Sequence, residues 1–338
     1  MTPFLRSAFL KSSLLIAVAS VPCTQAFAQL GAPCAANANA LGVTRTVEID
    51  TTGGPGFGFE QYKTHDFLQM KEVVLTFDDG PQRHHTEAVL AALAQHCAKA
   101  TFFSIGKMAL GYPEILREVA RQGHTIGTHT WSHTGVRKAK KPEDATAEIE
   151  KGISAVKRAA GGPIAPFFRY PFLQDSRDTL AHLASRNIAV FSTDVDSFDF
   201  KIKGAEQIVK SVMDKLERKG KGILLLHDIQ PGTAKAVPLL LAELKAKGYK
   251  VVHMKPKSAL ASLPEYDALI EASVKGLPAA GTEKATSSVV RTIEEPAAGK
   301  PAPAPAAAST GIISPAAAAP AVQEGTAPAK PKPGWFTR

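Results

Sequence analysis

Short apolar segments alternate with amphipathic segments through the middle of the chain, from about Glu72 to Met254. The apolar segments are rich in β-branched and aromatic residues and are apolar on both faces, which is typical of strands in a buried parallel sheet. Seven of them are strand candidates: VVLTFDD from Val73, ATFFSIG from Ala100, HTIGTHT from His124, PFFRYP from Pro166, IAVFSTD from Ile188, GILLLHD from Gly222 and YKVVHM from Tyr249.

The segments between these candidates carry apolar residues three and four positions apart, which predicts helices with one buried face. The faces are formed by Val89, Leu93 and Cys97, by Ile149, Ile153 and Val156, and by Val237, Leu240, Leu241 and Leu244. Alternation of strands and helices indicates parallel strands joined by crossover helices. We therefore expect an α/β fold, and seven such units suit an open or irregular barrel better than the eight-stranded one.

The first 28 residues have the pattern of an export signal. Arg6 and Lys11 give a positive start, SLLIAVASV is a short apolar core, and AFA, which ends at Ala28, is a small-x-small cleavage site. The apolar run is too short to span a membrane comfortably. We expect cleavage after Ala28, no stable membrane insertion afterwards, and a location in the periplasm, outside the cell or on the cell wall.

Composition divides the rest of the chain into three parts. Residues 29–71 form a Gly-rich lead that we expect to be irregular, and residues 72–262 form the folded domain. Residues 263–338 form a Pro- and Ala-rich tail, because ten of the 24 prolines follow Leu277. A segment of this composition cannot bury enough surface to fold, so the sequence predicts a flexible tail.

Export changes the interpretation of the cysteines. Cys34 and Cys97 remain after signal cleavage, as an even pair in an oxidising compartment. One interpretation is a disulfide that ties the N-terminal segment to the domain. The alternative is that Cys97, four residues after Leu93, is simply buried on the apolar face of a helix.

The chain is basic, with a formal net charge of +9. In an exported protein this charge favours a cell-wall polymer or an acidic glycan as the polyanionic partner. The sequence has no aromatic-plus-basic motif of a nucleic-acid binder, so no nucleic-acid partner is expected. Most Lys and Arg side chains are expected on an ordinary solvated surface.

Polar residues gather at the carboxyl ends of the strand candidates. In parallel α/β folds these ends meet at one rim, where binding and catalytic sites are built. The sequence therefore predicts one site at this rim rather than a set of unrelated turn residues. The polar residues concerned are Asp78, Asp79, His129, Arg169, Asp194 and His227.

The stretch HTWSH, just beyond the third strand candidate, suggests metal binding. On a helical turn, the spacing of His129 and His133 puts both imidazoles on one face, within reach of one cation. Two histidines and one carboxylate form a common catalytic metal set. Asp78 and Asp79 could supply the carboxylate, since neighbours along a strand point to opposite sides. One could bind the metal while the other faces the substrate as a base.

His227 lies on a separate strand end, where it would act as general acid and protonate the leaving group. A bound cation would lower the pKa of its water, and the cation and a backbone N–H would hold the oxyanion of the tetrahedral intermediate. This set of groups describes metal-assisted hydrolysis of an amide or an ester.

Five motifs, in order between Glu72 and Met254, resemble those of the polysaccharide deacetylase family. This is carbohydrate esterase family 4, whose homology domain is shared with chitooligosaccharide deacetylases. The resemblance implies a distorted (β/α) barrel, commonly with seven units. The motifs are TFDDG, HTWSH, RYPF, DSFDF and LLH.

The resemblance also implies a role for each matching residue. Asp78 would be the catalytic base, with Arg169 orienting and tuning it, and Asp199 would orient and charge His227, the general acid. The metal ligands would be Asp79, His129 and His133. The pocket residues would be Phe172, whose main-chain N–H would help to form the oxyanion hole, Leu225, which would line the acetyl-methyl pocket, and Phe200, an apolar wall where the family usually has Trp.

The sequence therefore predicts an exported, metal-dependent deacetylase that removes acetyl groups, N-acetyl in preference to O-acetyl, from a glycan. One divalent ion is expected, with Zn²⁺ favoured and Co²⁺ or another ion as alternatives. The substrate would be peptidoglycan, a chitin-like oligosaccharide or an exopolysaccharide. Two other functions stay open: hydrolysis of a non-sugar C–N amide bond on the same fold, and wall binding without catalysis.

Overall fold

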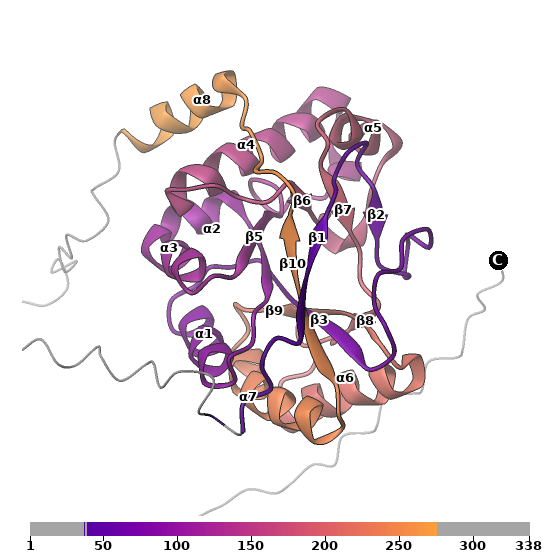
Figure 1. Ribbon diagram of the computed structural model, residues 1–338. Helices are drawn as coiled ribbons and strands as arrows, with labels where there is room; N and C mark the ends of the chain where they lie inside the picture. Colours follow the sequence, from indigo (N-terminus) through magenta and orange to yellow (C-terminus); the bar gives the residue numbers. More distant parts are fainter. Residues whose placement is uncertain (1–36, 38, 276–338) are drawn as a thin grey trace, which may run out of the picture. The chain divides into compact units, whose positions relative to one another are not determined.

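Parallel strands and the helices around them make up the part of the chain that the structure describes, residue 37 and residues 39–275 of this computed structural model (Figure 1). The strands are β1 (Arg45–Ile49), β2 (Gly56–Phe57), β3 (Glu72–Asp78), β4 (Thr101–Ser104), β5 (Thr125–Thr128), β6 (Phe167–Phe168), β7 (Ala189–Phe191), β8 (Val195–Asp196), β9 (Gly222–His227) and β10 (Lys250–Pro256). The α-helices are α1 (His85–Gln95), α2 (Gly106–Gly111), α3 (Pro113–Arg121), α4 (Pro142–Ala160), α5 (Arg177–Ser185), α6 (Ala205–Lys219), α7 (Pro231–Ala246) and α8 (Pro264–Val274). Two short 3-10 helices are η2 (Val136–Lys138) and η3 (Pro171–Leu173).

The seven expected strands are confirmed as β3, β4, β5, β6, β7, β9 and β10. The three predicted helical faces lie on α1, α4 and α7 and are buried, with the exception of the Cys97 position. Both results follow from burial, because a strand covered on both faces and a helix covered on one face leave the clearest apolar patterns in a sequence.

Cys97 lies beyond the end of α1, with a φ of 53°. The alternative that it sits on the apolar face of that helix is therefore wrong, because the helix ends at Gln95. Cys97 is disulfide-bonded. Its expected partner, Cys34, lies outside the described residues, so the pairing of these two cysteines stays a prediction.

The strands form a distorted barrel in which every pair is parallel. From β3 the sheet runs through β4, β5 and β6 to β7. The strand is then interrupted at residues 192–194, and the chain continues as β8. β8 pairs with β9, and β9 pairs with β3. Since β7 pairs on one side of the break and β8 on the other, this bent segment closes the ring.

β1 and β10 run side by side from top to bottom near the centre of Figure 1 and are paired along the whole of β1. β10 pairs with β3 only at Glu72 and Val73. Arg45 of β1 binds Glu72 through two hydrogen bonds of 2.8 and 2.6 Å, which fixes this pair of strands to the start of β3.

Two strands, β1 and β2, thus lie within residues 29–71, the segment that was expected to be irregular. β1 alternates between half-buried and exposed positions along RTVEI. Such alternation is typical of an edge strand, and it does not resemble the continuous apolar runs by which the other strands were found.

Helix α8 lies within residues 263–338, the segment that was assigned to the tail. It begins at Pro264, buries Ile270, and joins α4 through an ion pair of 2.6 Å between Arg158 and Glu271. The Pro- and Ala-rich part of that segment, residues 276–338, lies outside the described residues.

The interior of the barrel is filled by aromatic side chains. The ring of Phe191 lies 5.0 Å from that of Phe57, 4.8 Å from that of Phe167 and 5.7 Å from that of Phe103, measured between centroids. All four side chains are buried. In barrels whose interior is filled by side chains, substrate sites lie at the rim.

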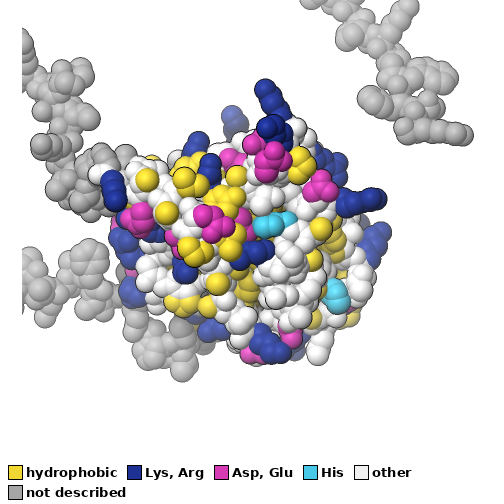
Figure 2. Space-filling model, turned by 90° about the horizontal axis from the view of Figure 1, so that it is seen from above, with side chains coloured by type: hydrophobic (Ala, Val, Ile, Leu, Met, Phe, Trp, Pro, Cys, Tyr) yellow, Lys and Arg dark blue, Asp and Glu magenta, His cyan; other side chains and the backbone are white. Residues whose placement is uncertain are grey.

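Charged side chains of both signs lie on the surface of the molecule. On the face shown in Figure 2, Lys and Arg side chains lie around the outline, with Asp and Glu side chains among them. Exposed pairs such as Lys210–Asp214 and Lys247–Glu217 are common on α6 and α7, and each contributes little to stability. Within the described residues, every helix is too short or too polar to cross a membrane.

The aromatic packing makes Phe191 critical for stability. Replacing it by alanine (Phe191→Ala) removes a ring that is 1% exposed and leaves a cavity, so we expect the free energy of unfolding to fall by about 3–5 kcal/mol. Urea unfolding followed by circular dichroism measures this change. Leu269→Ala on α8, where the side chain is 52% exposed, is the control and should change it by less than about 0.5 kcal/mol. Equal effects of the two substitutions would contradict the barrel core described above.

Candidate functional site

A pocket of about 380 Å³ opens where β3, β5 and β9 end. Nearly all the residues that the sequence predicted for the site line this pocket, and Arg169 and Asp199 lie behind its wall in contact with two of the lining residues. The lining residues are Asp78, Asp79, His129, His133, Tyr170, Phe172, Leu173, Asp196, Phe200, Leu225 and His227.

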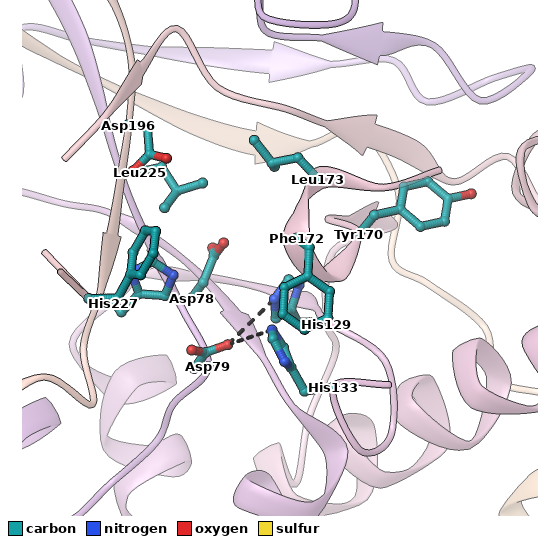
Figure 3. A pocket seen from close by; sticks show the side chains of 11 residues that line it. Asp78, Asp79, His129, His133, Tyr170, Phe172, Leu173, Asp196, Leu225 and His227 are labelled. Atoms are coloured by element: carbon teal, nitrogen blue, oxygen red, sulfur yellow. Dashed lines mark ion pairs between the residues drawn. The ribbon is translucent and has the colours of Figure 1, made fainter. Parts of the chain in front are cut away.

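Asp79, His129 and His133 converge on one side of the pocket (Figure 3). The Oδ1 atom of Asp79 lies 3.5 Å from Nε2 of His129 and 3.3 Å from Nε2 of His133. This oxygen is buried and has no hydrogen-bond partner within the described part of the chain, which is costly for a carboxylate unless another group satisfies it.

The spacing of these atoms fits a metal ion. Ligand bonds of about 2.0–2.1 Å in a tetrahedral arrangement place neighbouring ligand atoms about 3.3 Å apart. Nδ1 of His129 lies 2.7 Å from the main-chain oxygen of Arg169, and because that oxygen can only accept, Nδ1 carries the proton. This contact leaves Nε2 as the ring atom that faces Asp79 and is available to a metal ion.

His133 reaches this position through a loop rather than a helical turn. Thr130 and His133 have φ values of 64° and 61°, so the prediction of a helical turn was wrong. The loop is held by Glu148 of α4, whose main-chain oxygen accepts a hydrogen bond from Trp131 N at 2.8 Å. Burial, and then the neighbouring His129, lowers the pKa of His133, which keeps its imidazole in the neutral form that binds metals.

Asp78 is held by a buried arginine. Nη1 of Arg169 donates a hydrogen bond of 2.8 Å to Oδ1 of Asp78, and the two side chains are almost completely buried. The same guanidinium donates to Thr76 Oγ1 at 2.7 Å and to the main-chain oxygens of Phe191 at 3.2 Å and Ser192 at 2.7 Å. Because these four hydrogen bonds fix the guanidinium, the carboxylate of Asp78 has one fixed orientation and one oxygen left for the pocket.

Both aspartates line the same pocket, so the prediction that they point to opposite sides was wrong. Asp78 is the last residue of β3, and Asp79 has left the strand with a φ of 80°. Strand alternation does not extend through a residue in the left-handed region. This turn places the two carboxylates next to each other.

His227 lies across Asp78 and Asp79 from the two other histidines (Figure 3). Its Nδ1 is 2.6 Å from Oδ1 of Asp199, and Oδ2 of Asp199 accepts hydrogen bonds from His227 N at 2.7 Å and Thr233 Oγ1 at 2.5 Å. Burial lowers the pKa of His227, but the hydrogen bond and charge of Asp199, helped by Asp78 and Asp79, outweigh it and raise the pKa to about 9. His227 is therefore an imidazolium at neutral pH.

Apolar side chains form the remaining wall and the rim. Leu225 is buried in the wall, whereas Phe172 and Phe200 are 58% and 47% exposed. The ring of Phe172 lies 4.7 Å from that of His133, and the ring of Phe200 lies 5.6 Å from that of His227. The pocket thus combines charged groups at its base with aromatic surfaces at its mouth.

Two aspartates near the end of β7 differ in their environment. Asp194 accepts main-chain hydrogen bonds of 2.7 Å from Phe59 and from Ile223, so it braces the backbone and does not line the pocket. Asp196 does line the pocket, and burial raises the pKa of its carboxyl group. Tyr170 and Leu173 also line it and were not predicted; the only signal in the sequence was that Tyr170 lies within RYPF and Leu173 directly follows it.

Comparison with known proteins identifies the family. Residues 68–191 match the family model described as polysaccharide deacetylase. A chitooligosaccharide deacetylase of Bradyrhizobium sp. is 31% identical over 200 residues, which are 55% of this chain and 90% of that protein. The chain belongs to the polysaccharide deacetylase family. The five motifs that suggested this resemblance fall on the residues that line and support the pocket.

Other members of the deacetylase family are similar over part of their length. A peptidoglycan-N-acetylglucosamine deacetylase of Bacillus cereus is 34% identical over 187 residues, which cover 54% of this chain and 66% of that protein. The structure of a peptidoglycan deacetylase of Bdellovibrio bacteriovorus matches with a TM-score of 0.57 and 35% identity, over 63% of this chain and 59% of that one. The α/β fold is therefore that of the family, while about a third or more of these two proteins lies outside the match.

The contact between Asp199 and His227 generates a prediction about protonation. Asp199→Asn removes the negative charge that opposes the effect of burial, so the pKa of His227 should fall from about 9 by roughly one to two units. A titration of the metal-free protein followed by NMR of the histidine ring measures this pKa. Asp175→Asn, at a carboxylate that contacts Tyr62 and Arg137, is the control and should leave it unchanged. An unchanged His227 pKa in Asp199→Asn would show that Asp199 does not charge this imidazole.

Proposed function

We propose that this protein is a metal-dependent hydrolase that removes acetyl groups, N-acetyl in preference to O-acetyl, from peptidoglycan or a chitin-like oligosaccharide. The observation that carries this proposal is that a carboxylate, three potential metal ligands and an imidazolium line one pocket. Membership of the deacetylase family supports it, as do relatives named for the deacetylation of both kinds of glycan.

Asp79, His129 and His133 would hold one divalent ion. Zn²⁺ is the first candidate, because two imidazole nitrogens and one carboxylate oxygen leave an open position, as in catalytic zinc sites, although such a set also accepts Co²⁺ and other ions. When bound, the ion supplies a Lewis acid that polarises the acetyl carbonyl and lowers the pKa of water.

Asp78 would act as the general base. One of its oxygens is bound to Arg169, and the other would take a proton from the water that attacks the acetyl carbonyl carbon. The fixed orientation of the carboxylate favours this transfer, because proton abstraction requires the base within hydrogen-bond reach of the water.

His227 would act as the general acid. Its Nδ1 is bound to Asp199, so Nε2 is the atom that would donate a proton to the amine nitrogen as the C–N bond breaks. The products are acetate and a free amino group on the sugar, and one water is consumed. Asp199 supports this role by keeping His227 protonated near neutral pH.

The rest of the pocket would bind the acetyl group and the sugar. Leu225 would contact the acetyl methyl group, and the main-chain N–H of Phe172 would help to stabilise the oxyanion. The exposed rings of Phe172 and Phe200 offer apolar faces on which a sugar ring can stack. Each of these roles follows from position in the pocket and from the family motifs.

A protein with this activity on peptidoglycan would work outside the cytoplasm. The export signal predicted for residues 1–28 supports that location, although those residues lie outside the described part of the chain. The basic net charge of +9 also favours association with anionic wall polymers.

Removal of the metal tests the proposal as a whole. Treatment of the purified protein with a chelator should abolish acetate release from N-acetylglucosamine oligomers or peptidoglycan, and added Zn²⁺ or Co²⁺ should restore it, because the ion supplies the Lewis acid. Acetate is measured enzymatically. Asp79→Ala is the control, and added metal should not restore its acetate release. Activity that chelation does not change would overturn the proposed metal dependence. Activity on non-sugar amides alone would overturn the proposed glycan substrate.

A substitution at Asp78 separates the base from the ligands. Asp78→Asn keeps the shape of the side chain but cannot accept the proton, so kcat should fall by about 10²–10⁴-fold while bound Zn²⁺, measured by atomic absorption, stays at the wild-type level. Asp79→Asn is the matched variant and should lose Zn²⁺. The opposite pattern would mean that the two neighbouring aspartates exchange roles.

A further inference from the structure

Asp228 is a buried carboxylate that directly follows His227 and lies behind the pocket. It is 1% exposed, and each of its oxygens accepts a hydrogen bond from the segment that follows β3. The main-chain N–H of Gly80 donates to Oδ1 at 3.0 Å, and Oγ1 of Thr86 donates to Oδ2 at 2.6 Å. A buried carboxylate is costly unless both oxygens are satisfied, so these two contacts hold it in one place.

The carboxylate of Asp228 packs directly against the backbone of Gly80. A Cβ atom at position 80 would lie 2.1 Å from Oδ2 of Asp228 and 2.5 Å from its Cγ, which is far inside van der Waals contact. Glycine is therefore required at position 80 by the close approach of the Asp228 side chain. This contact explains why the motif TFDDG ends in glycine, at Gly80.

The contacts of Asp228 fix the two ends of residues 80–86, the segment that directly follows Asp79. Gly80 follows Asp79, whose φ of 80° is unusual for this residue type. At the other end, Thr86 in the first turn of α1 accepts a hydrogen bond of 2.8 Å from Gln82 N. Both ends of this segment are thus bound to Asp228, the first residue after β9.

We propose that Asp228 is a positioning residue for the metal site. By holding Gly80 and Thr86, it fixes Asp79 at the separation from His129 and His133 that a metal ion requires. Because Asp228 is next to His227, it also sets the distance between the metal ligands and the general acid. This proposal rests on the metal site of the proposed function, but not on the identity of the substrate.

Zinc affinity of the full-length protein tests this role directly. Asp228→Ala frees Gly80 N–H and Thr86 Oγ1 from their acceptor, so Asp79 is no longer held and the Kd for Zn²⁺ should rise about 10–100-fold. The Kd is measured by competition with a chromophoric chelator, at a temperature at which circular dichroism shows the variant folded. In the deacetylase assay, kcat should fall more than KM rises, since the aromatic rim is unchanged.

Asp194 provides a matched control. It is also a buried carboxylate that accepts two hydrogen bonds, but from the main-chain N–H groups of Phe59 and Ile223. Asp194→Ala should lower the melting temperature and leave the Kd for Zn²⁺ unchanged. A general loss of stability is thereby distinguished from displacement of Asp79.

The conservative variant should recover most of the affinity. Asp228→Asn keeps an oxygen that can accept from Gly80 N–H, whereas its amide nitrogen cannot accept from Thr86 Oγ1. Its Kd for Zn²⁺ should therefore lie between those of the wild type and Asp228→Ala.

Gly80→Ala tests the same contact from the other side. The new methyl group would displace the Asp228 carboxylate, so this substitution alone should lower the affinity for Zn²⁺. In the Asp228→Ala background there is no carboxylate to displace, and Gly80→Ala should add little. Such non-additivity is expected only of residues that act through one contact.

The outcomes separate this proposal from the metal site itself. A wild-type protein that binds no Zn²⁺, Co²⁺ or other divalent ion would overturn the metal site and the role of Asp228 together. A wild-type protein that binds Zn²⁺, with wild-type affinity in Asp228→Ala, would overturn only the role of Asp228. If Asp228→Ala does not fold, Asp228→Asn and Gly80→Ala decide, and wild-type Zn²⁺ affinity in both would overturn it.

Discussion

The ion pair between Arg169 and Asp78 is the constraint on which the rest of the site depends. Both partners are buried, and a guanidinium in that environment is strongly destabilising unless it is paired and well hydrogen-bonded. Arg169 satisfies this condition with groups on β3 and on the segment between β7 and β8, and its guanidinium lies 4.3 Å from the centre of the Phe103 ring on β4. It therefore joins strands that are far apart in the sequence and, through its own main-chain oxygen, orients His129.

The electrostatic character of the pocket differs between its two sides. On one side, burial keeps His133 neutral beside Asp79, as ligands for a cation must be. On the other side, Asp199 overcomes the same effect of burial and keeps His227 charged. His133 and His227 thus have opposite protonation states, because burial and His129 outweigh the effect of Asp79 on His133, whereas the hydrogen bond and charge of Asp199 outweigh burial at His227.

The sequence predicted the parts of the molecule whose residues are buried in a regular way. The strands β3 to β7, β9 and β10 could be found because both their faces are covered, and the polar residues at their ends indicated one rim. β1 and β2 were missed because an edge strand such as RTVEI has no continuous apolar run. The site was found through its motifs, but its geometry was not, because Asp79 and His133 adopt positive φ values that neither strand nor helix periodicity describes. Asp228 had no signal of its own, since its function depends on a contact with Gly80, which lies in a distant part of the chain.

The irregularity of the barrel has a chemical use. Between β7 and β8 the strand is interrupted, and the main-chain oxygens of Phe191 and Ser192 turn to Arg169. In an unbroken strand those oxygens would be taken up by neighbouring strands, and the guanidinium would have no acceptors there. A designer who grafted these catalytic side chains onto a symmetrical barrel would therefore have to copy the interruption too, or accept an arginine that cannot be buried.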